Sequence, residues 1–245
     1  AHAKDIWTIP EREIRKKLAA SDWVVTCTAA NVSYLAGLAM TPDKVALLYH
    51  GLDFTRFDQN TTPAAVRDGS DAQDTVRLIS VGRAVDKKGY EVLLAALAEL
   101  PTTLCWQFGH IGGGELLESL QLVARELGLA ERIQWLGALP QEQVLKQYRN
   151  ADLFVLPSKI SADGDRDGLP NVLMEAQSQR LACLSTRISG IPELIVHGET
   201  GWLIPPESSA LVQVLRELIH TPSHAKQRGL QARAHALENF SAQRF

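Results

Sequence analysis

The fold of this chain is decided by one stretch, Ala151-Asp-Leu-Phe-Val-Leu-Pro-Ser158 followed after a short loop by Asp163-Gly-Asp-Arg-Asp-Gly-Leu-Pro-Asn-Val-Leu-Met-Glu175. The first part is an apolar run ending in Pro and Ser, which is typical of a buried strand that stops there. Pro170 then stands where a helix can begin, because its fixed φ suits the first helical position and its missing N–H is not needed there. The stretch therefore predicts a strand, a polar loop and a helix over 170–179.

Two carboxylates occupy special places in this stretch. Asp167 lies just before the predicted helix, and Glu175 lies in its second turn, about 7 Å along the axis from Pro170 at about 1.5 Å per residue. Such a pair can hold two hydroxyl-bearing parts of one extended ligand. The ordinary alternatives are that Asp167 complements the helix dipole and that Glu175 is an exposed helix residue.

The same strand, loop and helix order repeats along most of the chain. This alternation predicts a Rossmann-like, doubly wound parallel α/β sheet with helices on both faces. The expected strands are 77–81, 103–108, 133–136, 153–156, 182–185 and 202–204. The expected helices are 90–100, 115–127, 141–149, 170–179, 191–196 and 208–219.

The remaining segments set the predicted domain boundaries. Residues 1–57 contain two predicted strands, 23–28 and 45–49, and two helices, 11–20 and 30–39. Two strands with one crossover cannot bury both faces of a sheet, so we expect 1–57 to belong to an incomplete domain that ends in a hinge. Residues 58–75 are polar and predict a linker or loop. Residues 76–222 form the main domain, and 223–245 form a C-terminal helix and tail that we expect to be cut short.

Composition narrows the class of protein. The chain has 245 residues, 45% of them hydrophobic, and a net charge of −3, which argues against a nucleic-acid partner. No apolar run approaches the roughly 20 residues of a membrane span. The three cysteines lie in apolar, strand-like runs, which favours reduced core residues in a cytosolic protein, and no spacing suggests a zinc site. The chain lacks an initiator Met, so we expect a fragment whose parent's signal peptide, if any, is not seen.

Several unusual residues follow the predicted strands. Ligands of open α/β sheets bind beyond the carboxyl ends of the strands, so these residues predict one binding cleft. They are Arg83 and Lys88 after the first strand, Gly112, Gly113 and Gly114 after the second, Leu136 and Gly137 at the third, Ser158 and Asp167 after the fourth, and Ser189 and Gly190 after the fifth.

Arg83 and Lys88 suit a diphosphate, because a guanidinium fork and an ammonium both bind phosphate oxygens. The alternative is that Arg83 pairs with Asp86 and that Lys88 is solvated. A helix beginning near Gly89 adds an N-terminus that favours anions.

Three further motifs are weaker. The run 112–114 is interpreted as a glycine turn at the cleft, or as a plain turn, because it lacks the spacing of a dinucleotide fingerprint. Asp163-x-Asp-x-Asp-Gly168 resembles the start of a calcium loop, but the twelfth residue is Met174 where a Glu is needed, so calcium is disfavoured. Glu193 is interpreted as a helix N-terminal charge.

The motifs together resemble the retaining glycosyltransferases of family 4, also called group 1. The paired acids Asp167 and Glu175 match the family's two-acid motif, although its first acid is usually Glu. The other matching motifs occur in the family's order: Val81-Gly-Arg-Ala-Val-Asp-Lys-Lys-Gly89, Ile111-Gly-Gly-Gly-Glu115, Trp135-Leu-Gly137, Ser189-Gly-Ile-Pro-Glu193 and Gly198-Glu-Thr-Gly-Trp202. The opening Ala1-His-Ala-Lys-Asp-Ile-Trp7 resembles that of the family's bacterial exopolysaccharide transferases of the colanic-acid type.

This resemblance implies the C-terminal, donor-binding half of a two-domain GT-B-type enzyme, with the tail of the N-terminal acceptor domain. It implies transfer of a hexose from a nucleotide-diphosphate sugar, with a UDP-sugar favoured, to a glycan or lipid-linked glycan with retention, in bacterial polysaccharide biosynthesis. The sugar nucleotide is a co-substrate, and no metal or other cofactor is implied. A cytoplasmic enzyme, peripheral at the inner membrane, is expected.

The resemblance also assigns residues. Asp167, Glu175 and His2 are catalytic: Glu175 bonds the ribose, Asp167 faces the donor sugar and its phosphate, and His2 faces the sugar across the cleft. Arg83 and Lys88 bind the diphosphate. The other donor-binding residues are Gly112, Gly113, Gly114, Leu136, Gly137, Ser158, Gly168, Leu169, Pro170 and Asn171.

Other functions fit the same architecture. One is a sugar-nucleotide epimerase, and another is a phosphorylase, which would need a pyridoxal lysine that is not evident. A third is a nucleotide-sugar-binding module in which Asp167 marks lost catalysis.

Overall fold

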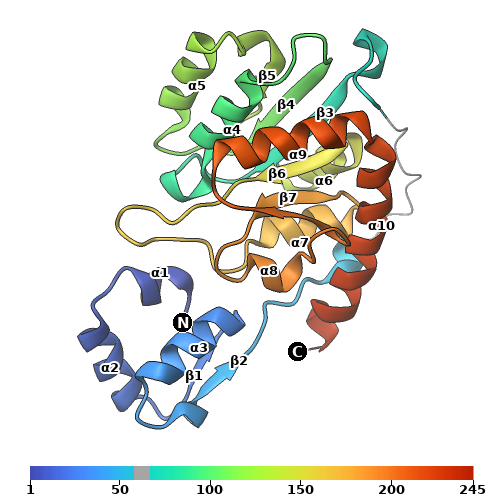
Figure 1. The fold of residues 1–245 in the computed structure, drawn as a ribbon. Coiled ribbons are helices and arrows are strands. Elements are labelled where there is room, and N and C mark those ends of the chain that lie inside the picture. The colour runs from blue at the N-terminus through green and yellow to red at the C-terminus, as the bar shows by residue number, and fades with distance from the viewer. Residues whose placement is uncertain (58–66, 245) are drawn as a thin grey trace.

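The computed structural model describes residues 1–57 and 67–244, and its main feature is a parallel sheet of six strands (Figure 1). The strand order is β5-β4-β3-β6-β7-β8, and every neighbouring pair is parallel. The strands are β3 (Val76–Val81), β4 (Trp106–Ile111), β5 (Ile133–Trp135), β6 (Leu153–Leu156), β7 (Cys183–Thr186) and β8 (Gly201–Ile204). The predicted parallel α/β fold is therefore confirmed.

Helices cover both faces of this sheet (Figure 1). They are α4 (Tyr90–Ala98), α5 (Leu117–Glu126), α6 (Gln141–Asn150), α7 (Asn171–Ser178), α8 (Ile191–Leu194), α9 (Ser208–His220) and α10 (Pro222–Asn239). α4 packs with α5 and α9, whereas α7 packs with α6 and α10. Every residue of β6, β7 and β8 is buried, as expected of strands covered on both faces.

The direction of strand addition reverses between β3 and β6. From β3 the chain adds β4 and β5 on one side, and β6, β7 and β8 follow on the other. Such a reversal leaves a crevice beyond the carboxyl ends of the two central strands, because their following loops diverge. The loops after β3 and β6 are those that carry the predicted diphosphate-binding residues and acids.

Some predicted bounds were shifted. β4 begins three residues later than predicted, because residues 101–104 form a turn in which Leu104 N–H donates to Pro101 C=O at 3.1 Å. α7 begins at Asn171, so Pro170 is its N-cap and not its first helical residue. The short helix α1 (Ala3–Trp7) was not predicted.

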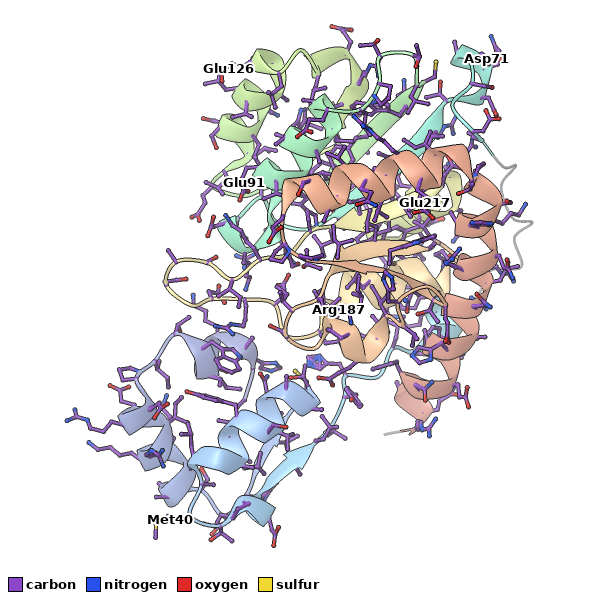
Figure 2. All side chains as sticks on the ribbon, viewed as in Figure 1. Met40, Asp71, Glu91, Glu126, Arg187 and Glu217 are labelled. Atoms are coloured by element: carbon purple, nitrogen blue, oxygen red, sulfur yellow. The ribbon has the colours of Figure 1, made fainter. Side chains whose placement is uncertain are left out.

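The first 57 residues form a smaller unit with its own apolar core (Figure 1). α1, α2 (Glu11–Ala20) and α3 (Ala29–Leu38) pack beside a parallel pair, β1 (Val24–Thr26) and β2 (Val45–Leu47). Large apolar side chains remain exposed here: Trp23, Met40, Leu47 and Leu48, with Met40 labelled in Figure 2. The assignment of 1–57 to an incomplete domain remains a prediction.

The predicted linker 58–75 lies partly outside the described residues. Its described part, 67–75, contains the turn η3 (Ala72–Asp74) and is joined to the sheet, because Cys105 N–H donates to Gly69 C=O at 2.9 Å. None of the helices in residues 1–57 and 67–244 has the length and apolar character needed to cross a bilayer.

The chain crosses between the two units after β2, and the segment that follows α10 pairs with this crossing. Leu52 N–H donates to Phe240 C=O at 2.8 Å, and Ala242 N–H donates to Leu52 C=O at 2.9 Å. A Cβ on Gly51 would lie 2.2 Å from Ala242 Cα, so glycine is required for this approach. The segment that follows α10 is thus hydrogen-bonded alongside the segment that connects the two units.

Candidate functional site

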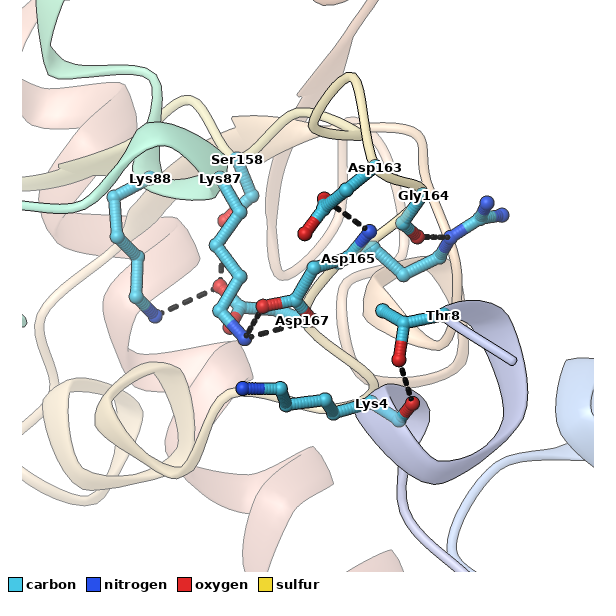
Figure 3. Close-up of polar contacts among 10 residues, drawn as sticks. Lys4, Thr8, Lys87, Lys88, Ser158, Asp163, Gly164, Asp165 and Asp167 are labelled. Atoms are coloured by element: carbon cyan, nitrogen blue, oxygen red, sulfur yellow. Dashed lines mark hydrogen bonds and ion pairs between the residues drawn. The ribbon is translucent and has the colours of Figure 1, made fainter.

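A cluster of ion pairs lies at the carboxyl ends of β3 and β6 (Figure 3). Lys88 Nζ lies 2.7 Å from Asp167 Oδ2, and the hydroxyl of the fully buried Ser158 donates to the same oxygen at 3.0 Å. Lys87 Nζ lies 3.1 Å from an oxygen of Asp165 and 3.8 Å from Asp167 Oδ1. The structure thus brings together three predicted site residues, Lys88, Ser158 and Asp167.

One glycine allows the two loops to meet. Gly89 has φ of 65°, and a Cβ at this residue would lie 2.1 Å from Pro157 C=O. The turn η4 (Asp86–Lys88) precedes it, and α4 begins directly after it. Because the backbone passes so close to the end of β6, both lysines of the turn reach the acids of the following loop.

Arg83 is exposed at this edge and has no ion-pair partner among the residues described. Asp86 instead pairs with Lys159 at 2.7 Å, and this contact holds the pKa of the Asp86 carboxyl below its usual range. The alternative of an Arg83–Asp86 pair with a solvated Lys88 is therefore wrong. The Arg83 guanidinium stays available for a ligand.

The glycine run packs against the loop that follows β3. A Cβ on Gly112 would lie 2.1 Å from Gly82 C=O, and one on Gly114 would lie 2.5 Å from Ala84 C=O. Ala84 N–H donates to Gly113 C=O at 2.7 Å, whereas the Cβ position of Gly113 has open space around it. Two of the three glycines thus serve loop packing, and α5 begins later than predicted, at Leu117.

Gly137 joins this arrangement from the end of β5. Its C=O accepts from Gly112 N–H at 2.8 Å, and its φ is 65°. Leu136, directly before it, is half-buried. The ends of β3, β4 and β5 therefore converge on one edge, as predicted.

Glu175 lies in the second turn of α7 and is half-buried. Tyr148 Oη donates to Glu175 Oε2 at 3.4 Å, and burial raises the pKa of the Glu175 carboxyl. It is not the exposed helix residue of the alternative interpretation. No hydrogen bond or ion pair among the described residues links it to Asp167, so the two acids occupy separate environments.

The segment around His2 lies against the loop of Asp167. A Cβ on Gly168 would lie 3.7 Å from Ala3 Cβ and 3.8 Å from Cys27 Sγ. Of the residues that follow, Leu169 and Pro170 are buried, whereas Asn171 is exposed. The structure thus brings the segment that contains His2 against Gly168, the residue after the first acid.

Two lysines of the site were missed by the sequence analysis. Lys4 and Lys87 line a pocket with Arg83, and its acidic lining includes Asp163 and Asp165. Figure 3 shows the Lys4 side chain extending toward the cluster. Lys87 could have been found as the neighbour of Lys88 in one turn, whereas Lys4 lies in a distant segment from which only His2 was assigned to the site.

The loop acids are held within the protein. Asp163 Oδ1 accepts from Asp165 N–H at 2.9 Å, and Asp165 pairs with Lys87. Asp165 is therefore held in an ion pair and is not a solvated loop acid.

Glu193 lies in the first turn of α8, as predicted, and it also contacts the smaller unit. Its carboxylate accepts from Ala29 N–H at 2.8 Å and Ala30 N–H at 3.1 Å, at the first turn of α3. Tyr49 Oη also donates to it at 2.7 Å, and burial with this bond raises the pKa of Tyr49. Glu193 thus binds the smaller unit to the end of the main sheet.

Comparison with known proteins identifies the family. The family described as "Glycosyl transferases group 1" matches residues 65–235, more than half of the chain. This chain belongs to the group 1 glycosyltransferases. The match covers the whole six-stranded sheet and both loops of the ion-pair cluster.

Curated relatives share this region. The amylovoran biosynthesis glycosyltransferase AmsK of Erwinia amylovora is 38% identical over 145 residues, which cover 58% of this chain and 36% of that protein. The putative colanic acid biosynthesis glycosyltransferase WcaL of Salmonella typhimurium is 32% identical over 185 residues, which cover 75% of this chain and 44% of that protein. The chain thus spans less than half the length of these relatives.

Solved structures show the same fold. Anabaena Alr3699/HepE, solved in complex with UDP, matches with a TM-score of 0.80 at 19% identity and covers 95% of this chain and 65% of its own. Sucrose-phosphate synthase of Thermosynechococcus elongatus matches with a TM-score of 0.79 at 22% identity, covering 96% of this chain and 59% of its own. The architecture is that of the GT-B glycosyltransferases, and the six-stranded sheet resembles their C-terminal half.

Proposed function

We propose that this chain binds the nucleotide-sugar donor of a retaining hexosyltransferase in bacterial polysaccharide biosynthesis. The observation that carries the proposal is the cationic edge at β3 and β6, where Arg83, Lys87 and Lys88 meet the Asp167 loop. Family membership supports it, and so do the names of the amylovoran and colanic acid relatives. UDP in the Anabaena complex makes a UDP-sugar the favoured donor.

The cations would stabilise the leaving diphosphate. Negative charge builds on that group as the bond to the sugar breaks, and preorganised cations lower the barrier most where charge develops. Arg83 can bind two phosphate oxygens at once, and Lys88 binds as a point charge. The N-terminus of α4, directly after Gly89, adds favourable backbone dipoles.

The remaining groups would act on the sugar and the ribose. Glu175, half-buried on α7, can accept from two vicinal ribose hydroxyls, while Asp167 and His2 face the donor sugar from two walls. We propose further that transfer retains the anomeric configuration and needs no metal. The acceptor would be a glycan or lipid-linked glycan, and the enzyme would act in the cytoplasm, peripheral at the inner membrane.

The decisive experiment is calorimetry of the protein with UDP, GDP and ADP and with their nucleosides. Lys88→Ala should weaken UDP binding by about 1.5–3 kcal/mol, because one charge-assisted bond is lost. Uridine binding should hardly change. Lys16→Ala, on the exposed face of α2, is the matched control. Equal losses for UDP and uridine would show that Lys88 does not bind the diphosphate.

Glu175→Gln gives the complementary result in the same experiment. It should weaken UDP binding yet leave 2′,3′-dideoxy-UDP almost unaffected, because the dideoxy ligand lacks the hydroxyls that Glu175 accepts from. Similar losses for both ligands would assign Glu175 to helix packing through Tyr148.

A further inference from the structure

Three metal-ligating side chains meet where the two units face each other. The ligand atoms of His2, Cys27 and His50 all lie within 4.8 Å of one another. His2 precedes α1, Cys27 directly follows β1, and His50 lies between β2 and the paired crossing at Leu52. Their sequence separations match no zinc motif, so the sequence analysis did not detect this group.

The separations are close to those that a bound ion requires. In a tetrahedral site with Zn–S of about 2.3 Å and Zn–N of about 2.0–2.1 Å, ligand atoms lie about 3.3–3.6 Å apart. The ligand atoms of His2, Cys27 and His50 lie at most 4.8 Å apart, which exceeds this range by about 1 Å. His2 is exposed and its ring stands edge-on to that of His50 with centroids 5.4 Å apart, so a rotation of the His2 side chain can close the difference.

An unsatisfied nitrogen points to a ligand at this place. His50 Nε2 is buried and has no hydrogen-bond partner among the described residues. A buried polar atom without a partner costs free energy, and coordination of a cation removes that cost. Cys27 beside it is buried as well, at 5% exposure.

We propose that His2, Cys27 and His50 bind a Zn²⁺ ion with three protein ligands. The donor set of one thiolate and two imidazoles suits Zn²⁺ and excludes Mg²⁺ and Ca²⁺, which prefer oxygen ligands. Binding converts the Cys27 thiol to a Zn-bound thiolate and releases its proton to water, which balances the step. The fourth position is left for water, as in other three-ligand sites.

The position of the site gives it a regulatory consequence. Cys27 Sγ lies 3.8 Å from the Cβ position of Gly168, next to Asp167. The ion would also coordinate His2, which the proposed function places at the donor sugar. We therefore expect Zn²⁺ to inhibit transfer. This consequence rests on the proposed function, whereas metal binding itself does not.

The test is titration of the untagged protein with Co²⁺, a spectroscopic substitute for Zn²⁺. Wild-type protein should bind one equivalent and show the near-ultraviolet thiolate-to-cobalt charge-transfer band, and Zn²⁺ should abolish the band by displacement. Cys27→Ser should lack the band. Cys105→Ser, which removes the half-exposed cysteine outside the group, should retain it. Absence of a saturable band in wild type, or its persistence in Cys27→Ser, would overturn the proposal.

Two histidine variants keep the test decisive if Cys27→Ser fails to fold. His2→Gln and His50→Gln should keep the thiolate band but bind Co²⁺ at least about tenfold more weakly, because each loses one ligand. Unchanged affinity in both would overturn the site. In a transfer assay with a longer chain that contains these residues, Zn²⁺ should inhibit the wild-type sequence, EDTA should reverse the inhibition, and Zn²⁺ should inhibit His50→Gln far less. If nucleotide fails to bind at all, the cobalt titration still decides the metal site.

Discussion

Asp167 is held by groups that a ligand would compete for. Its carboxylate pairs with Lys88, which has 12% exposure, and accepts from the buried Ser158. A diphosphate at this edge would repel Asp167 and attract Lys88. The pair therefore preorganises the lysine but must be loosened when the donor binds.

Asp167→Asn tests this competition between the carboxylate and the diphosphate. Without UDP, the change leaves Lys88 buried and unpaired, so the free energy of unfolding should fall by up to about 3 kcal/mol. UDP should restore much of this loss and bind more tightly than to wild type, because the competing carboxylate is gone. Thermal unfolding with and without UDP measures both effects. A variant that is equally stable and binds UDP less tightly would contradict this account.

His110 on β4 provides a prediction about pH. It is fully buried, both ring nitrogens lack hydrogen-bond partners in the described chain, and burial lowers its pKa to about 4. Between about pH 4 and pH 6.5 the unfolded chain binds one more proton than the folded chain, so stability contributed by neutral His110 is present above pH 6.5 and is lost as pH falls.

His110→Leu removes this dependence. As pH rises from about 4 to about 6.5, the unfolding free energy of the wild type should increase by about 3 kcal/mol more than that of the variant, since one pKa unit corresponds to about 1.4 kcal/mol. Denaturant unfolding at several pH values checks this. His224→Leu, at an exposed position of α10, should follow wild type. Parallel curves for wild type and His110→Leu would show that His110 does not titrate in this range.

Helix α3 of the smaller unit depends on Glu193 of the main unit. Thr28 accepts from Asn31 N–H, and Glu193 accepts from Ala29 and Ala30, so donors of the first turn are satisfied from two sources. The negative charge also complements the helix dipole.

Glu193→Gln should therefore weaken the connection between α3 and the main sheet. Loss of the charge-assisted bonds should lower the unfolding free energy by about 1–3 kcal/mol. Hydrogen exchange at the Ala29 and Ala30 amides should accelerate. Glu207→Gln, exposed before α9, is the matched control. Unchanged exchange at both amides would show that water satisfies these N–H donors of α3 as well as Glu193 does.

The elements were predictable to the extent that local chemistry determines them. Strand β6 follows from a continuous apolar run, because burial on both faces leaves no polar alternation. The start of α5 was missed because Glu115 and Leu116 form a turn after the glycines. The contacts of Glu193, and the pocket that Lys4 lines with Arg83, join positions far apart in the chain, and only the folded backbone brings them together.

The whole molecule joins a fully covered sheet to a small one with exposed apolar side chains. The proposed donor-binding groups lie on the main sheet, whereas His2 and its neighbours form the proposed second wall. Enzymes that close two walls on a ligand need both to orient reactants and exclude water.

We therefore expect a chain limited to residues 1–245 to bind nucleotide but transfer no sugar. Labelled sugar nucleotide and a membrane extract, incubated with this chain and with a longer chain containing it, measure the difference. Calorimetry on the same samples confirms that nucleotide binding survives. Transfer at a similar rate by both chains would show that residues 1–245 hold the whole active site.

The paired crossing at Leu52 limits how the two units can move. A single extended connection could twist freely, but backbone hydrogen bonds on both sides of Leu52 fix this connection to the segment that follows α10, the last helix of the main unit. Motion of the small unit relative to the main sheet should then arise between β2 and Leu52, at residues 48–51, and it requires release of the bonds that Glu193 makes to α3.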